Sequence, residues 1–333
     1  MKLHKNIPLF RDAIRITAQQ MNIPPEFVEK DYWVTYALYT IFNNEIGKDT
    51  VFKGGTALSK CYNMIERFSE DIDLVVQRRE GESNNKLTTK IKTISNVVNA
   101  VLPEINDDRI TQKMGMNRKT AHSYGKEFKG DYGQVRDVIV VEATWLGYHE
   151  PYNTKSIVSF VGQMMLDNMQ SDIAKEYGLL PFDLLALEPI RTICEKIMSL
   201  VRFSYGENPI DELKQKIRHT YDLHQLLQQD EFLKFLQSPA FDEMLLKVAN
   251  DDVASFKNNN QWLIYHPNEA LIFKDLKNVW NELKTVYIGD FKNLVYGVLP
   301  NEKAILETLK MIRERMVTVQ WEIVNDKTSD KIK

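Results

Sequence analysis

Apolar side chains recur every three to four residues in two stretches near the start of the chain, 8–21 and 25–42. This spacing places them on one face of a helix. Asn22 and Pro24 separate the stretches, and Pro25 is tolerated in the first turn of the second one. We therefore predict two N-terminal helices.

The second helix carries large apolar residues and a run of charged ones. We expect Tyr32, Trp33 and Leu38 to pack it on a sheet. This packing role is preferred to a catalytic role for the neighbouring charged residues, which are Glu29, Lys30 and Asp31.

The pattern then changes to short apolar runs with strand character. A strand with β-branched residues is predicted over 135–146. The other predicted elements before residue 180 are an apolar run at 51–53, a helix over 56–66, a strand over 71–76, an amphipathic helix up to about residue 101, and two short strands in a hairpin within 109–136.

From Leu185 onward the pattern is almost entirely helical. Helices are predicted near 186–204, 211–229, 231–249, 269–286 and 300–320. The fold class is therefore α+β: a small mixed sheet with flanking helices in residues 1–180, followed by a mainly α-helical domain in residues 181–333.

The composition is that of a globular protein, with 43% hydrophobic and 27% charged residues among 333. A formal net charge of −3 excludes an overall basic, nucleic-acid-coating character, so any such contact needs a local patch. The two cysteines, Cys61 and Cys194, lie on apolar helical positions and indicate buried thiols in a reducing compartment. With no signal peptide and no apolar run long enough to span a membrane, we expect a cytoplasmic protein without a membrane partner.

Two carboxylates define the first candidate site. Asp71 and Asp73 point to the same face of the predicted strand, roughly 6.6 Å apart. Like charges this close raise each other's pKa, and a bound divalent cation removes that cost. Oxygen ligands suit Mg²⁺ or Mn²⁺ better than zinc.

The glycine pair before the second predicted helix adds a candidate phosphate site. Gly54 and Gly55 let the backbone turn and approach a ligand closely. Thr56 follows with a hydroxyl beside the free N–H groups of the helix start, where anions are stabilised. Either feature alone is weak, but together they form a specific constellation.

The segments FKGGTALSK and RFSEDIDLVV carry a resemblance to a known family. They are similar to the nucleotidyltransferase superfamily with a DNA polymerase β-like core, and within it to the AbiEii/AbiGii toxins of type IV toxin–antitoxin and abortive-infection systems. Fifteen residues separate Gly55 from Asp71, which is longer than usual in the superfamily but in keeping with this family's extra Arg-x-Ser-x segment. The resemblance is close over 51–76, fair over 186–227 and thin after residue 240.

The resemblance implies a third carboxylate on a neighbouring strand. Glu142 fits by order and by its apolar neighbours, and a lone glutamate there is costly unless it is paired or metal-bound. Asp137 is the alternative, but it lies at the start of the strand. The implied metal ligands are thus Asp71, Asp73 and Glu142.

The family also carries a lysine that follows a glutamate and precedes a hydrophobic residue, and Lys196 matches it. It also carries an aspartate within an Arg-x-x-Tyr-Asp-Leu segment, and Asp222 matches this one. From the residues alone both would be surface positions. The resemblance implies that Lys196 is a ligand of the triphosphate. Asp222 would hold the lysine, position a metal-bound water or act as a base.

Arg67 and Ser69 complete the implied nucleotide-binding set, which is Gly54, Gly55, Thr56, Arg67, Ser69 and Lys196. Arg67 could bind phosphate or form an ion pair with Glu66 or Glu70, and Ser69 could cap the segment or donate to phosphate. Lys53 and Lys60 flank the glycines, but neither is assigned a contact.

The segment 109–136 is the local basic stretch, with seven Lys and Arg against two acids. It could contact RNA or nucleotide phosphates. The alternative is a solvated sheet edge protected by lysines.

The resemblance implies a metal-dependent nucleotidyltransferase toxin that moves a nucleotide from an NTP to an acceptor, with the 3′ end of tRNA as the implied acceptor and Mg²⁺ or Mn²⁺ as cofactor. A protein or small-molecule acceptor stays open. A separately encoded antitoxin is the implied partner. The alternatives are a phosphotransferase that uses the γ-phosphate and a non-catalytic nucleotide- or RNA-binding module. We expect a cleft between the domains, with Lys196 and Asp222 facing Asp71 and Asp73.

Overall fold

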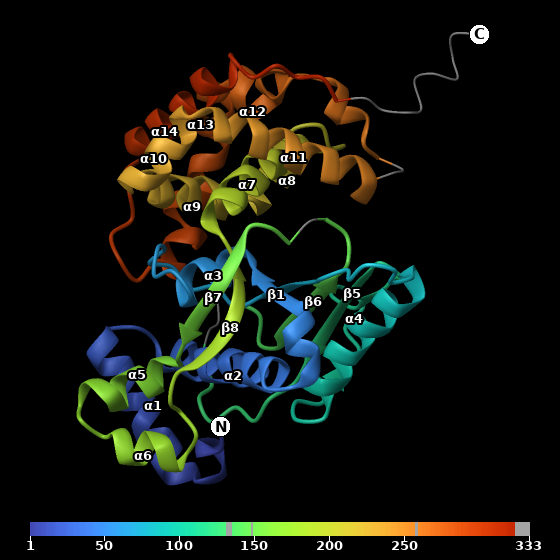
Figure 1. The fold of residues 1–333 in the computed structure, drawn as a ribbon. Helices are drawn as coiled ribbons and strands as arrows, with labels where there is room; N and C mark the ends of the chain where they lie inside the picture. The colour runs from blue at the N-terminus through green and yellow to red at the C-terminus, as the bar shows by residue number, and fades with distance from the viewer. Residues whose placement is uncertain (131–134, 148, 257–258, 324–333) are drawn as a thin grey trace. The chain divides into compact units, whose positions relative to one another are not determined.

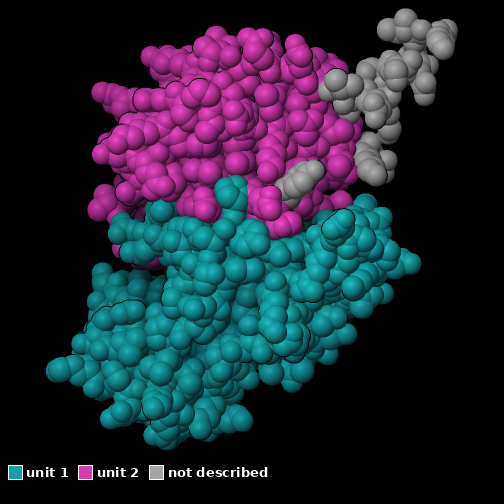
Figure 2. Space-filling view, viewed as in Figure 1, with its two compact units in different colours: residues 1–145, 151–187 teal, residues 146–150, 188–333 magenta. Residues whose placement is uncertain are grey.

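The computed structural model describes residues 1–130, 135–147, 149–256 and 259–323 (Figure 1). The chain forms two compact units (Figure 2). Unit 1 comprises Met1–Trp145 and Pro151–Leu187, and unit 2 comprises Leu146–Glu150 and Glu188–Lys333. The predicted α+β class is confirmed, because unit 1 contains a mixed sheet with helices and unit 2 is built from helices. The predicted division after residue 180 stays a prediction.

The sheet of unit 1 has the strand order β3-β5-β6-β2-β1-β8-β7, with β4 paired to β5. β1 pairs with β8 and β2 with β6 in parallel, whereas the other pairs are antiparallel. The strands are β1 (Thr50–Lys53), β2 (Ile72–Val76), β3 (Glu104–Ile105), β4 (Gln112–Lys113), β5 (Asn117–His122), β6 (Ile139–Thr144), β7 (Tyr152–Ile157) and β8 (Phe182–Leu187).

Two long helices, α2 and α4, contact each other and both contact β6, so they cover the same region of the sheet (Figure 1). α1 packs on α2 and α5, and α6 packs on α5. The helices of unit 1 are α1 (Ile7–Met21), α2 (Pro25–Phe42), α3 (Gly54–Lys60), α4 (Asn84–Asn99), α5 (Phe160–Asp167) and α6 (Ser171–Glu176), with 3-10 turns at Leu3–Lys5 and Glu45–Asp49.

The ends of these helices follow from local side-chain chemistry. The Asn6 side chain accepts the N–H of Leu9 and begins α1, and Asn22 ends it in the left-handed conformation with φ 53°. The Ser83 hydroxyl accepts the N–H of Lys86 and begins α4. Both N-terminal helices are confirmed, and Tyr32, Trp33 and Leu38 are buried as predicted.

Unit 2 is a set of helices around a buried apolar centre. They are α7 (Pro189–Phe203), α8 (Pro209–Gln215), α9 (Ile217–Leu227), α10 (Asp230–Gln237), α11 (Pro239–Ser255), α12 (Leu271–Lys274), α13 (Leu276–Ile288) and α14 (Glu302–Met316), with 3-10 turns at Gln261–Ile264, Pro267–Glu269 and Asp290–Leu294.

Three helices predicted in unit 2 are each divided into two. The predictions over 211–229, 231–249 and 269–286 correspond to α8 with α9, α10 with α11, and α12 with α13. At the second break the cause is plain: Ser238 is extended, and Pro239 has no N–H to continue the ladder of α10. Apolar periodicity continues across such a break because both helices bury apolar residues, such as Phe232 and Leu236 in α10 and Phe241 and Leu245 in α11.

Unit 1 also differs from the sequence prediction. The helix after the glycines is α3, which ends at Lys60 instead of residue 66, and Asn63 turns the chain with φ 52°. The predicted hairpin of β4 and β5 is confirmed. The interpretation as a solvated sheet edge fits β4, whose Gln112 and Lys113 are exposed, but not β5, which lies inside the sheet next to β6. Residues 131–134 of the basic stretch lie outside the described residues. β7, β8, α5 and α6 were not predicted.

Two further sequence features have a structural counterpart. Cys61 and Cys194 are free thiols; Cys194 is buried as predicted, whereas Cys61 at the end of α3 is only partly buried, and desolvation raises the pKa of both. In the part of the chain that the structure describes, no helix combines the length and the apolar character that crossing a membrane requires.

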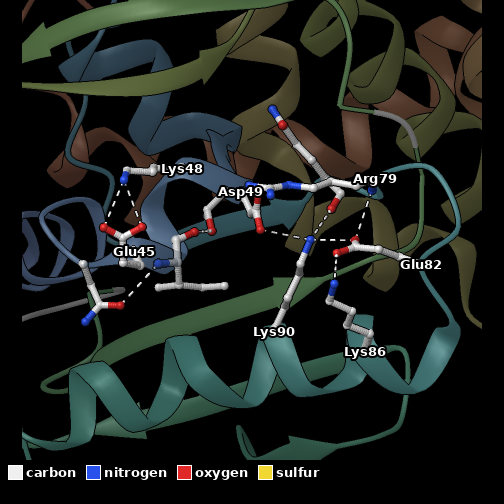
Figure 3. A network of polar contacts seen from close by, with 11 residues as sticks. Glu45, Lys48, Asp49, Arg79, Glu82, Lys86 and Lys90 are labelled. Carbon is white, nitrogen blue, oxygen red and sulfur yellow. Dashed lines mark hydrogen bonds and ion pairs between the residues drawn. The ribbon is translucent and has the colours of Figure 1, made fainter.

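A polar network joins the 3-10 turn Glu45–Asp49, the loop after β2, and α4 (Figure 3). Lys90 on α4 is 3.0 Å from Asp49 and 2.7 Å from Glu82, and Lys86 is 3.2 Å from Glu82. Arg79 donates to Asp49 through Nε at 2.8 Å. Asp49 directly precedes β1, so this network fixes the end of the β1–β2 pair that lies away from Asp73.

Glu82→Gln tests whether this network stabilises unit 1. Burial alone would raise the pKa of Glu82, but hydrogen bonds from Lys90, the Arg79 N–H and Lys86 outweigh it and lower the pKa from 4.5 to about 2. A lowered pKa in the folded protein stabilises it above the unfolded-state value. Urea unfolding should show the largest loss of stability at neutral pH, and this loss should shrink as the pH falls from 4.5 toward 2.

Glu45→Gln is the control, because Glu45 forms an exposed ion pair with Lys48 in the same region, with a Glu45 side chain that is 86% exposed. It should change stability little at any pH. A loss for Glu82→Gln that does not depend on pH would contradict the role given to its charge.

Candidate active site

Strand pairing places four charged residues side by side across the sheet. Lys53 of β1 is the partner of Asp73 on β2, Asp73 is the partner of Glu142 on β6, and Glu142 is the partner of Lys119 on β5. Directly paired residues point to the same face of a sheet. We call Lys53, Asp73, Glu142 and Lys119 the charged row.

Asp71 lies next to this row. It precedes β2 by one residue, and alternation places it on the same face as Asp73. Its Oδ1 is 2.7 Å from Nη1 of Arg136, which lies just before β6. The three carboxylates predicted from the sequence, Asp71, Asp73 and Glu142, thus share one region of one sheet face.

The charges in this region perturb Asp73 most. Burial of its carboxylate, together with the negative charges of Glu142 and Asp71, raises the pKa of Asp73 to about 7, against the opposing effect of Lys53 and Lys119. A cation placed near Asp73 would stabilise the ionised form of its carboxylate and so lower its pKa.

The backbone of the glycine pair lies directly against these side chains. Gly54 has φ +80°, and a Cβ at this position would lie 2.2 Å from Oδ2 of Asp73. A Cβ on Gly55 would lie 2.7 Å from Nη2 of Arg67 and 3.0 Å from Oγ of Ser69. Gly54 is therefore required by its backbone conformation and by the close approach of Asp73, whereas a Cβ at Gly55 would have to displace the ends of the Arg67 and Ser69 side chains.

Thr56 connects the glycine turn to the segment that leads into β2. Its hydroxyl donates to the carbonyl of Asp71 at 2.7 Å and lies 3.0 Å from the hydroxyl of Ser69. Arg67 is buried and donates to the carbonyl of Phe68 at 3.1 Å. The predicted nucleotide-binding residues of unit 1 are thus brought together: Gly54, Gly55, Thr56, Arg67 and Ser69.

The charged residues of α2 hold the segments around this site. Lys30 is buried, forms an ion pair with Glu70 at 2.6 Å, and donates to the carbonyls of Val138, at 2.6 Å, and Arg136. Glu70 in turn accepts the N–H of Arg136 at 2.9 Å. Glu70 is one of the two partners that the sequence offered for Arg67, and here it pairs with Lys30.

The neighbours of Lys30 act in the same way. Glu29 accepts the N–H groups of Glu127 at 2.8 Å and Phe128 at 3.0 Å. Asp31 accepts from Lys60 of α3 and from the N–H of Phe160 at 2.8 Å. These buried contacts agree with a structural role for the charged run, and they occupy Lys60, which flanks the glycines in the sequence.

The two candidates for the third carboxylate are placed very differently. Asp137 lies before β6, pairs with Lys126 at 2.7 Å, and has a side chain that is 65% exposed. Glu142 lies within β6, where Lys119 contacts it at 2.9 Å and the Asn117 amide at 3.1 Å. This placement favours Glu142, which stays a prediction as a metal ligand.

The donor atoms suit a hard divalent cation, because all three carboxylates offer oxygen. Within the described ranges, however, no group of three or more His, Cys, Asp or Glu side chains is arranged to hold a metal ion. Asp71 and Glu142 instead contact Arg136 and Lys119. The predicted ligands therefore fit by chemistry, but an oxygen of Asp71 and one of Glu142 are directed at side-chain cations.

Unit 2 holds the other two predicted residues. Lys196 on α7 and Asp222 on α9 form an ion pair at 2.7 Å, with side chains 7% and 0% exposed. Nδ1 of His219 is 3.4 Å from the ammonium group. The surface positions expected from the residues alone are wrong, because the apolar faces of α7 and α9 enclose the pair. That these residues face Asp71 and Asp73 stays a prediction.

Sequence reasoning did not assign Lys119, Arg136 or Asn117 to the site. The sequence shows that Lys119 and Arg136 are basic residues of the 109–136 stretch. It does not show that they contact Glu142 and Asp71, because these contacts depend on β5 lying next to β6 and β6 next to β2.

Gly54→Ala tests the close approach to Asp73. The added Cβ combines left-handed backbone strain with a clash against the Asp73 carboxylate, so urea unfolding should show a loss above the roughly 1–2 kcal/mol of the backbone term alone. Gly81→Ala is the matched control: Gly81 has φ +74° and open space around it. Equal losses in the two variants would contradict the packing of Gly54 on Asp73.

Lys196→Met and Asp222→Leu test the buried ion pair. Each single change removes one member of the buried ion pair and should cost about 3–5 kcal/mol, whereas the double variant should cost clearly less than the sum. Lys303→Met, in an exposed pair with Glu307, should cost under about 1 kcal/mol. Additive losses at Lys196 and Asp222 would show that the two charges are not coupled.

Comparison with known proteins assigns the family. None of the curated proteins gave a significant match. Among solved structures, the chain is similar to MenT4, a nucleotidyltransferase toxin from Mycobacterium tuberculosis H37Rv, with a TM-score of 0.53 and 16% identity over 95% of this chain and 92% of that chain. This likeness shows the fold. The family model described as nucleotidyl transferase AbiEii toxin, type IV TA system, matches residues 36–307. The chain therefore belongs to the AbiEii nucleotidyltransferase toxins of type IV toxin–antitoxin systems.

Proposed function

We propose that this toxin transfers a nucleotide from an NTP to an acceptor hydroxyl in a reaction that depends on Mg²⁺ or Mn²⁺. The main support is the pairing of Asp73 with Glu142 on adjacent strands, beside Asp71 and against the backbone of Gly54. We assign cation binding to Asp71, Asp73 and Glu142. The bound cation would neutralise charge on the NTP phosphates during transfer.

The glycine turn and its neighbours are assigned to the nucleotide. The backbone of Gly54 lies directly against the Asp73 carboxylate, and that of Gly55 lies against Arg67 and Ser69, so a phosphate held by this turn would lie close to both groups. Thr56, Arg67 and Ser69 surround the same turn and supply hydroxyl and guanidinium donors. Glu142 is assigned to the acceptor hydroxyl, which it would bind or deprotonate directly or through the cation.

Family membership supports a part for Lys196 and Asp222 in the same reaction, with the Lys196 ammonium as a ligand of the triphosphate. Of the three roles open to Asp222, its burial and its ion pair with Lys196 favour holding the lysine. A base for the acceptor would need access that a fully buried side chain lacks.

We propose the 3′ end of tRNA as the acceptor and a separately encoded antitoxin as the partner, with both meeting the toxin in the cytoplasm. The support is membership of a type IV toxin family.

The direct test is incubation with Mg²⁺, total cellular RNA and an NTP labelled at either the α- or the γ-phosphate. Label from the α-position should appear on RNA of tRNA size with the wild type. It should fall to background with Asp71→Asn and persist with Asp137→Asn, which changes the alternative carboxylate outside β6.

The labels also separate the alternatives. Transfer from the γ-position alone would identify a phosphotransferase. Saturable NTP binding without label on RNA, protein or small molecules would favour the non-catalytic binding module. Undiminished transfer by Asp71→Asn would contradict the assigned site.

A further inference from the structure

Two cations of the basic stretch contact the proposed cation ligands directly. Arg136 is 2.7 Å from Asp71, and Lys119 is 2.9 Å from Glu142. Their side chains are 42% and 24% exposed, so neither is locked in the core. The carboxylate oxygens that would bind a divalent cation are therefore already shared with protein charges.

These contacts are specific within the stretch. Arg109, Lys113 and Lys126 also form ion pairs, but with acids outside the site: Asp107, Glu104 and Asp137. Lys119 is directed at Glu142 by strand register. The backbone of Arg136 is fixed separately, because its N–H donates to Glu70 and its carbonyl accepts from Lys30.

Charge balance shows what these two residues do for the site. Asp71 and Glu142 are each compensated by one side-chain cation, Arg136 and Lys119. A divalent cation that binds these two carboxylates must displace their present partners, and it also meets repulsion from them.

We propose that Lys119 and Arg136 are exchangeable counter-ions of the cation site, which leave Glu142 and Asp71 when a divalent cation binds and then contact the phosphates of the nucleotide. This inference rests on the proposed function and adds a binding order to it. The planar guanidinium of Arg136 suits phosphate oxygens as well as it suits a carboxylate. The cation and the nucleotide should therefore strengthen each other's binding. The cation replaces Lys119 and Arg136 at the carboxylates, and the nucleotide phosphates then give these two side chains new partners.

The test measures Mn²⁺ binding by electron paramagnetic resonance, with and without a non-hydrolysable NTP analogue, so that activity is not needed. In the wild type the analogue should tighten Mn²⁺ binding. Arg136→Gln and Lys119→Met should each bind Mn²⁺ alone about two- to fivefold more tightly, as expected for the loss of one partly exposed ion pair. Both should show less tightening by the analogue.

Three controls define the result. Arg136→Lys keeps the charge and should behave like the wild type for Mn²⁺ alone. Arg109→Gln removes a cation of the same stretch whose partner is Asp107, and it should change neither measurement. Asp73→Asn should abolish the site-specific Mn²⁺ signal, which separates it from adventitious binding.

Mn²⁺ affinities that are equal or weaker in Arg136→Gln and Lys119→Met, with Asp73→Asn still abolishing the signal, would overturn the exchange and leave the metal site intact. A wild type that binds the analogue but no Mn²⁺ at all would overturn the metal-dependent function together with the exchange.

Discussion

The constraint on which this fold depends is the parallel pairing of β2 with β6, which puts Asp73 beside Glu142. Burial of the Asp73 carboxylate, together with repulsion from Glu142 in register on the adjacent strand, raises the pKa of Asp73. The structure offsets this repulsion with Lys53 and Lys119 on the outer strands of the charged row. The sheet of this chain thus holds two repelling carboxylates side by side, with a lysine on the strand at either end of the charged row.

The buried charges of α2 explain how this arrangement is held. Glu29, Lys30 and Asp31 each reach a different segment: the loop at 127–128, the Glu70 side chain before β2, and Lys60 of α3. Isolated, each would be costly to bury, but each has a charged or backbone partner. One turn of helix therefore fixes the glycine turn, the start of β2 and the loop that carries Arg136.

The sequence allowed the placement of neighbouring residues to be predicted, but not the long-range pairing of strands. Asp71, Asp73 and the glycines were recognisable because their spacing is set within one strand–helix–strand unit. The Lys119 contact with Glu142 depends on strand order, which no local pattern encodes. Burial of Lys196 and Asp222 was likewise invisible, because it takes two helices to enclose them. Helix breaks such as the one at Pro239 were missed because apolar periodicity continues through them.

The most direct test of the central claim is a crystal structure with Mn²⁺ and a non-hydrolysable NTP analogue, using anomalous scattering to locate the metal. The account predicts an anomalous peak within bonding distance of Asp71 and Asp73, beside Glu142, with the Arg136 and Lys119 ion pairs opened. A peak elsewhere, or a metal bound at these carboxylates with both ion pairs still closed, would contradict it.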